Sequence, residues 1–333
     1  MNIEYSFVPL SKLDYYLVNP EIDSESILTT GLDLYETSII SYPYRDNNNP
    51  VVCLAIVDGR IAGRFMLFHT KLKVGSCVLP VQTGGGILVA EKYRGLGIGQ
   101  NLIRAVLNND FYLGALFTRA AYNIVRKTEV MLEIPQYVRN SNHGIRKILD
   151  IPLLLKQYQL KKRVFVKKLS TVPNWVTDMI MSDTHEYMEV HDSSWLQWAL
   201  DNNATGNRKD YQAFYAIYDN SRHPLGFFLT KVRHIENEGI YYKKANLVEW
   251  SSANMELLDE ADINLLALGT LDSSVSKFWT ISNSIETESK LAKYLFRRKG
   301  WFAMSVKNDG TFEGIGDSGK WRIRYGCSNT PIV

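Results

Sequence analysis

An arginine followed by three glycines at alternate positions interrupts an apolar stretch near residue 97. The apolar run before this turn predicts a buried strand at residues 87–89, and the apolar spacing after it predicts a helix. Glycines leave backbone amides open to a ligand, and a helix N-terminus presents unpaired N–H groups at a positive dipole end. The pattern therefore predicts a cradle for a diphosphate, formed by Arg94, Gly95, Leu96, Gly97, Ile98 and Gly99.

The spacing of these glycines excludes two common nucleotide loops. The Gly-x-Gly-x-x-Gly fingerprint is absent, and no Gly-Lys-Ser/Thr follows the glycines. The segment instead resembles the Arg/Gln-x-x-Gly-x-Gly/Ala loop of the GNAT superfamily of N-acetyltransferases, in which the loop amides hold the pyrophosphate of acetyl-CoA and the preceding strand pairs with the pantetheine arm. A turn that only packs a helix against a sheet is the alternative. Besides residues 94–99, the resemblance assigns acyl-CoA binding to Ile87, Leu88, Val89 and Thr118, the last of which stands where the family commonly has an asparagine.

The residues that would move protons are less evident. The GNAT family often uses a tyrosine on the helix after the fifth strand as general acid, and Val125 stands at that position here. Tyr122 lies one turn earlier and is the candidate catalytic acid, with packing as the alternative role for a tyrosine on a helix face. Glu36 and Glu91 flank the expected cleft, and we expect both to be solvated charges.

A second group of polar and aromatic residues lies between residues 183 and 198. It contains His185 and His191 near Asp183, Glu186 and Asp192, but the spacing fits no zinc signature and we expect no metal. Trp195 and Trp198 are at helical spacing, and packing between domains is favoured over a stacking platform for a flat acceptor.

Composition limits the class of protein. The chain has 333 residues, which suggests two domains, and its 45% hydrophobic and 22% charged residues are ordinary for a globular protein. A net charge of +3 is too small to predict a nucleic-acid partner. The three cysteines show no Cys-x-x-Cys spacing and are expected to be reduced core thiols, two of them within strands. With no signal peptide and no membrane-spanning run, a cytoplasmic location without membrane insertion is expected.

The order of expected elements also matches the GNAT pattern. Strands are expected at residues 3–9, 51–57, 61–70, 78–89, 112–117 and 130–138, with helices at 11–18, capped by Ser11, and at 119–126. The helix after the glycine turn carries its apolar face on Ile98, Leu102, Ala105 and Val106. Gly84, Gly85 and Gly86 predict a bulge in the strand that contains them.

The second half of the sequence repeats this order of strands and helices but lacks the glycine loop. Strands are expected at residues 211–218, 225–235, 246–251 and 275–282, and helices at 261–270 and 288–299. Residues 292–301 resemble the closing GNAT helix. Phe296 stands at its tyrosine position. We therefore predict an α/β protein of two GNAT-like domains, each with a central mixed, mostly antiparallel sheet flanked by helices. Residues 1–164 are expected to bind acyl-CoA, and residues 165–333 are expected to form a degenerate domain at the acceptor site or an interface.

The predicted activity is transfer of an acyl group, with acetyl-CoA or another acyl-CoA as donor, to the nitrogen of a small-molecule acceptor such as an amino sugar or amino-acid derivative. Two alternatives stay open. Peptidoglycan-building aminoacyl transferases of the Fem type also pair two GNAT-like lobes, although they usually lack the CoA loop. A non-catalytic CoA-binding scaffold is compatible with the missing tyrosine. A homodimer is a possible assembly.

Overall fold

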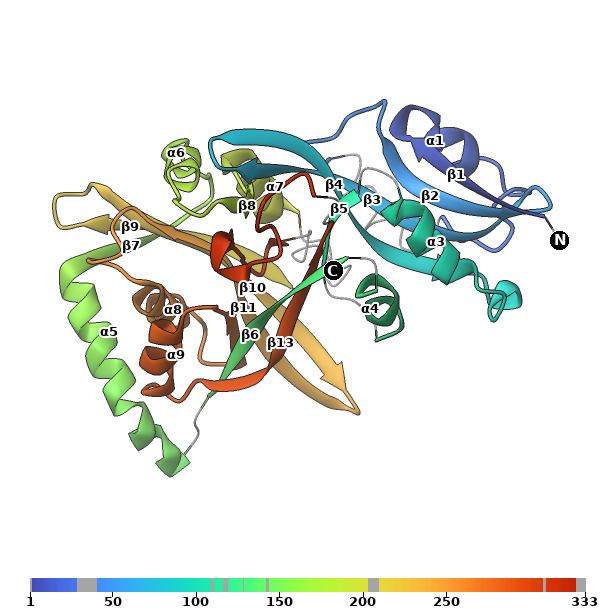
Figure 1. Cartoon of the computed structure of the whole chain (residues 1–333). Coiled ribbons are helices and arrows are strands. Elements are labelled where there is room, and N and C mark those ends of the chain that lie inside the picture. Colours follow the sequence, from blue (N-terminus) through green and yellow to red (C-terminus); the bar gives the residue numbers. More distant parts are fainter. Residues whose placement is uncertain are drawn as a thin grey trace.

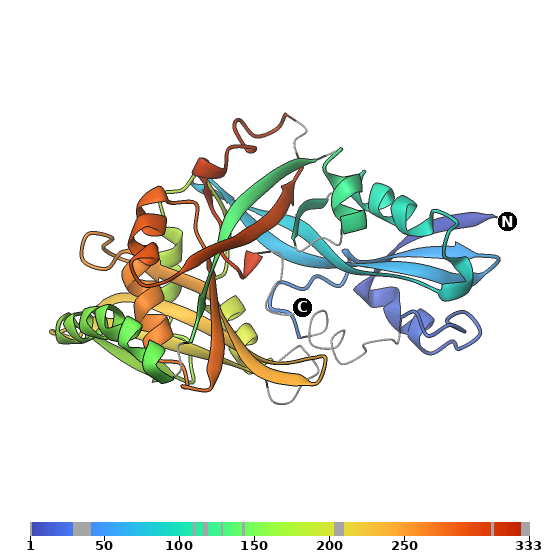
Figure 2. The same cartoon turned by 90° about the horizontal axis from the view of Figure 1, so that it is seen from below.

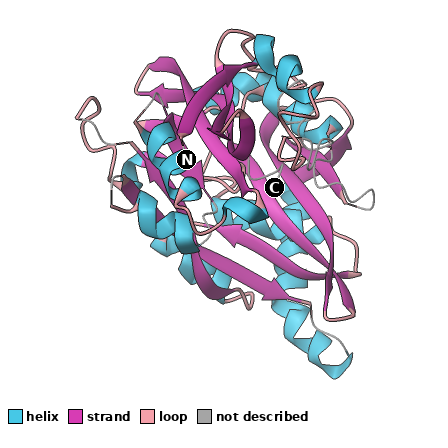
Figure 3. Ribbon diagram, turned by 90° about the vertical axis from the view of Figure 1, so that its right-hand side faces the viewer, coloured by secondary structure: helices cyan, strands magenta, loops and turns pink. Residues whose placement is uncertain are grey.

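The computed structural model describes residues 2–28, 41–108, 111–115, 119–127, 129–141, 144–202, 210–307 and 310–327. The strands form one continuous, strongly twisted sheet that runs through both halves of the chain (Figure 1). Its order along the main path is β1-β2-β3-β4-β5-β13-β6-β12-β11-β10-β9-β7, with β8 and β14 attached beside β3. Helices lie on both faces of the strands, as Figures 2 and 3 show.

The first half contains the elements that position the glycine turn. Strands β2 and β3 are buried on both faces and are joined by a two-residue turn at Asp58 and Gly59, whose φ values of 48° and 78° suit a tight hairpin. The elements are β1 (Ile3–Pro9), α1 (Leu10–Leu17), β2 (Pro50–Val57), β3 (Arg60–Val74), β4 (Cys77–Val89), η2 (Glu91–Tyr93), α3 (Ile98–Leu107), β5 (Phe111–Ala115), α4 (Arg119–Val125) and β6 (Val130–Asn140).

The second half repeats the alternation of strands and helices. Its long hairpin is β10 and β11, and α8 is the helix at the position of α3. The elements are η3 (Gly144–Asp150), α5 (Ile151–Arg163), β7 (Val164–Leu169), α6 (Trp175–Met181), β8 (Tyr187–Glu189), α7 (Ser193–Asp201), β9 (Tyr211–Asp219), β10 (Pro224–Asn237), β11 (Ile240–Ser252), α8 (Glu260–Gly269), β12 (Val275–Ile281), α9 (Ile285–Ala292), β13 (Arg297–Val306), η4 (Ser318–Lys320) and β14 (Trp321–Arg322).

The two halves exchange a strand at the centre of the sheet. Strand β13 belongs to the second half of the sequence but lies between β5 and β6, where Met304 faces both Ala115 and Leu132. Strand β6 in turn lies between β12 and β13. Each half is therefore completed by a strand from the other, which makes their separate folding unfavourable. The domain division at residue 164 stays a prediction.

Helices cover each half of the sheet from two sides. In the first half α1 packs on one face with Leu54, while α3 and α4 pack on the other face with Phe65 and Leu67. In the second half α5, α8 and α9 cover one face, and α6 and α7 cover the other. None of the described helices combines the length and apolarity needed to cross a bilayer.

The predicted α/β class is confirmed, and most expected elements form, with three differences. The first helix begins at Leu10 after Pro9 and has no side-chain cap, so the predicted cap at Ser11 is wrong. The predicted closing helix at residues 288–299 is also wrong, because α9 ends at Ala292 and a left-handed Leu295, with φ of 64°, leads into β13. Cys77 is exposed rather than a core thiol, whereas Cys53 and Cys327 are buried.

Candidate functional site

The glycine turn forms an open, uncapped helix N-terminus. Gly95 and Gly97 have φ values of 83° and 76°, a left-handed conformation that side chains disfavour, and Gly97 is the N-cap of α3. The first helical hydrogen bond is donated by Asn101 N–H to the Gly97 carbonyl at 3.0 Å. The amides before it are therefore available to a ligand. A Cβ added at either glycine would meet no atom within 4 Å, so the space in front of the turn is open.

Helix α3 is held firmly behind this turn. The side chains of Ile98, Leu102 and Val106 are buried, and Ala105 is partly buried, as the helical spacing predicted. The helix approaches β3 closely at Gly63, where a Cβ would lie 3.2 Å from Leu102 Cδ1. A rigid helix keeps the amides of its first turn in a fixed direction.

The edge of β4 opens beside the turn. Strands β4 and β5 run parallel, and among the described residues their pairing ends at Gly84 with Gly114, while β4 continues to Val89 paired only with β3. Gly86 has φ of 62° next to a register shift, so the predicted bulge is confirmed. Backbone groups on the β5 side of residues 85–89 can therefore pair with an extended ligand.

The side chains of this edge strand pack away from the opening. Ile87 and Val89 pack toward α3, and Leu88 packs toward α1. Leu96, in the turn, is half exposed. Arg94 is exposed, with Nε 3.4 Å from the Val89 carbonyl, so its guanidinium is available to an anion at the turn. Thr118 and Glu36 lie outside the described residues, and Glu91 is exposed in η2.

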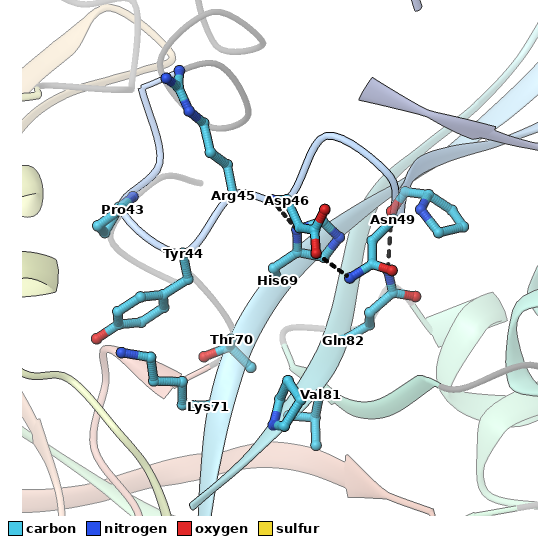
Figure 4. Close-up of a pocket in the computed structure, with 12 residues that line it drawn as sticks. Pro43, Tyr44, Arg45, Asp46, Asn49, His69, Thr70, Lys71, Val81 and Gln82 are labelled. Carbon is cyan, nitrogen blue, oxygen red and sulfur yellow. Dashed lines mark hydrogen bonds between the residues drawn. The ribbon is translucent and has the colours of Figure 1, made fainter. Parts of the chain in front are cut away.

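A cavity of about 610 Å³ is lined by β4 as far as Gln82, the residue at which the described pairing of β4 with β5 begins. The segment of residues 43–50 forms one wall and the adjoining parts of β3 and β4 form the other (Figure 4). Gln82 lies in this wall, pairs with Phe111 of β5, and donates from Nε2 to the Pro50 carbonyl at 2.9 Å. Sequence reasoning missed this cavity, because its residues belong to no motif and meet only through the strand register.

His69 is the titratable group that this cavity buries most. Its Nδ1 accepts a hydrogen bond from the Asp46 N–H at 3.1 Å, which places the proton of the neutral ring on Nε2. Burial lowers the pKa of His69, more than the nearby Pro50 carbonyl and Asp46 raise it, so the neutral ring is favoured. Within the described chain Nε2 is buried without a partner.

Tyr122 lies on α4 and is hydrogen-bonded across to β6. Its hydroxyl donates to Glu133 Oε1 at 2.5 Å, and this contact raises the pKa of Tyr122. The phenol therefore holds its proton at neutral pH, as a general acid requires before it reacts. Val125, at the family's tyrosine position, is buried and packs behind the helix.

The histidine and tryptophan residues of the second half form a buried network. His191 is fully buried, with Nδ1 2.5 Å from Glu249 Oε2, and its ring stacks on Trp195 with centroids 3.9 Å apart. Trp195 and Trp198 are both buried, so they pack and offer no stacking platform. In the part of the chain that the structure describes, no His, Cys, Asp and Glu group of three or more is placed to hold a metal ion.

This network reaches the cavity through one hydroxyl. Thr70, in the cavity wall, donates from Oγ1 to Glu189 Oε1 at 2.8 Å, and Glu189 lies beside His191. Burial alone would lower the pKa of His191, but the Glu249 carboxylate hydrogen-bonded to Nδ1 and the nearby Glu189 carboxylate outweigh it and raise the pKa to about 9. The protonated ring of His191 therefore lies between Glu189 of β8 and Glu249 of β11, behind the cavity wall.

Comparisons with known proteins find similarity in fold only. No family model matches the chain, and a search of curated proteins finds no match. Solved structures do match. A GCN5-related N-acetyltransferase from Anabaena variabilis is similar over 92% of this chain and 73% of its own, with a TM-score of 0.57 and 10% identity. One from Kribbella flavida matches over 91% and 71%, with a TM-score of 0.52 and 11% identity.

N-myristoyltransferase from Saccharomyces cerevisiae, solved with bound myristoyl-CoA, is also similar. It matches over 92% of this chain and 79% of its own, with a TM-score of 0.51 and 11% identity. The GNAT fold predicted from the glycine turn is thereby confirmed.

Proposed function

Because the chain has the GNAT fold, we propose that it is an acyl-CoA-dependent N-acyltransferase that uses acetyl-CoA and a small-molecule amine. One observation carries the proposal. Among the described residues the β5 side of β4 is unpaired at residues 85–89, and this edge leads directly into an open helix N-terminus at Gly97. An extended arm ending in a diphosphate needs a pairing edge and an anion site in this order. A turn that served only for packing would not need open space in front of Gly95 and Gly97.

The donor would bind along this edge. Amides of the first turn of α3, with the Arg94 guanidinium, would hold the pyrophosphate, and backbone groups of residues 85–89 would pair with the pantetheine arm. The thioester would then lie near Gly84, where β4 and β5 separate. A backbone amide there can stabilise the oxyanion that forms on the thioester carbonyl.

The acceptor would occupy the neighbouring cavity, where His69 and Gln82 can orient it. The neutral amine attacks the thioester carbonyl, so the C–N bond forms, the C–S bond breaks and the amine loses a proton. The leaving thiolate takes a proton, which Tyr122 is proposed to supply because its hydroxyl is held protonated by Glu133. The acceptor itself is proposed to be an amino sugar or an amino-acid derivative.

The test is release of CoA in the presence of a panel of amino sugars and amino acids, with acetyl-CoA and myristoyl-CoA as alternative donors. Replacing Arg94 by alanine should raise the KM for acetyl-CoA roughly tenfold with kcat little changed, since a charged hydrogen bond contributes about 1.5–3 kcal/mol. Arg60→Ala, at the exposed start of β3, is the matched control. Affinity for acyl-CoA without CoA release from any pair would contradict catalysis and favour the scaffold alternative.

A further inference from the structure

A second cavity, of about 310 Å³, is lined by a cluster of cations in the second half of the chain. It lies where β6, β12 and the beginning of β13 meet. Figure 1 shows β13 beginning beside α9 and running from there toward β5, so the cavity lies at the end of β13 that is remote from β5. Its lining residues are Val138, Asn140, Lys277, Trp279, Arg297, Arg298 and Lys299.

The strand register brings these side chains together. Lys277 of β12 is opposite Asn140 of β6, and Arg297 of β13 is opposite Val138 of β6. On the other side of β12, Lys277 is level with Lys244 of β11. Cross-strand neighbours point to the same face, and like charges at such positions destabilise a sheet. The arrangement therefore carries an energetic cost that some other interaction must offset.

No carboxylate offsets this charge within the described residues. Lys244, Lys277, Arg297, Arg298 and Lys299 have no carboxylate oxygen within 4.0 Å, whereas Lys156 and Lys290 elsewhere in this half are ion-paired. Lys244, Lys277 and Arg298 contact aromatic rings instead, and a ring contact leaves the positive charge in place. The nearest ring centroids are those of Trp279 for Lys244 at 4.7 Å, Tyr242 for Lys277 at 4.5 Å and Trp301 for Arg298 at 4.0 Å.

The backbone at the beginning of β13 leaves several of these cations exposed. Between Arg298 and Trp301 the pairing of β13 with β6 is irregular, and Gly300 has φ of 81°. The irregularity leaves Lys299 without a partner on β6, and residues 297–299 are exposed. At the cavity wall, Trp279 Nε1 is buried without a hydrogen-bond partner among the described residues.

We propose that this cavity binds an anion of the phosphate-ester class that carries at least two negative charges. Two adjacent guanidinium forks suit phosphate oxygens, the two lysines supply further positive charge, and the Asn140 amide can donate a neutral hydrogen bond. The volume is at the lower end of the roughly 300–1,000 Å³ typical of ligand pockets, so it fits a phosphorylated head group rather than a large ligand. The site is separate from the glycine turn and does not depend on the proposed acyl transfer.

Titration calorimetry with tripolyphosphate at low salt, without CoA, tests the proposal. The double variant Arg297→Ala with Lys299→Ala should bind tripolyphosphate at least tenfold more weakly than the wild type. Lys161→Ala with Lys162→Ala, which removes the same charge from the exposed last turn of α5, is the matched control and should bind as the wild type does. Affinity should fall as salt is raised.

Three results would overturn the proposal. The first is that the wild type does not bind tripolyphosphate at millimolar concentration. The second is that both double variants bind tripolyphosphate more weakly than the wild type by the same factor. The third is that the wild type binds citrate as tightly as tripolyphosphate, which would remove the preference for phosphate. A Gly97→Trp variant without CoA separates this site from the glycine turn. It should keep its affinity for tripolyphosphate, and loss of that affinity would assign the binding to the glycine turn and also overturn the proposal.

Discussion

Protonation of His191 should make the stability of the folded chain depend on pH in a defined range. The ring is fully buried between Glu189 and Glu249, and its pKa is raised from 6.5 to about 9. A raised pKa means that the folded state binds the proton more tightly than the unfolded state. The resulting stabilisation is fully present below pH 6.5 and is lost as the pH rises through 9. A difference of this size corresponds to about 3 kcal/mol.

The assay is urea unfolding of the wild type and of His191→Gln at pH 6 and at pH 9.5. The free energy of unfolding of the wild type should exceed that of the variant by about 3 kcal/mol more at pH 6 than at pH 9.5. His223→Gln is the control, because His223 is 79% exposed beside Asp219 and its replacement should give no such difference between the two pH values. A wild-type advantage over His191→Gln that is the same at both pH values would refute the buried imidazolium.

Two further predictions concern single residues. Tyr122→Phe should lower turnover by roughly 100-fold or more, the usual contribution of a general acid, without weakening acetyl-CoA binding. The control Tyr158→Phe, on α5, should change neither turnover nor binding. Unchanged turnover in Tyr122→Phe would contradict the assignment of Tyr122 as general acid. Gly226→Ala should lower the free energy of unfolding by about 1–3 kcal/mol, since its Cβ would lie 2.6 Å from the Ser251 carbonyl. In the same urea titration Gly85→Ala is the control and should have little effect, because the nearest atom to its Cβ is in Phe68 at 3.7 Å. Equal stability of the two variants would contradict the packing of β10 on β11.

Local patterns predicted the conformation of the glycine turn and the helix after it. Glycine at positions 95 and 97 permits a positive φ, and the structure has it at both. Helix α3 follows because its apolar residues repeat at the helical period and pack against β2 and β3. These features depend on neighbours in sequence, which is why spacing alone was sufficient to locate them.

The cavity proposed for the acceptor depends on contacts between distant segments and was not predictable in the same way. The cavity joins the segment at Asp46 to His69 and Gln82, residues that carry no shared motif. Residues 297–299 were expected in a helix, because periodicity cannot show that β13 inserts between β5 and β6. Tertiary pairing overrode the local helical preference there. The same insertion created the cationic cavity, which an overall charge of +3 conceals.

The most direct test of acyl-CoA binding is thermal unfolding of the wild type, Gly97→Trp and Gly59→Trp, each with and without saturating acetyl-CoA. Both glycines have positive φ, 76° and 78°, and both have open space at Cβ, so the strain introduced should be similar. At about a hundred times its dissociation constant, acetyl-CoA should stabilise the wild type and Gly59→Trp by roughly 2.7 kcal/mol and leave Gly97→Trp unchanged. Equal stabilisation of both variants, or none in any of the three proteins, would contradict the assignment of the glycine turn as the acyl-CoA site.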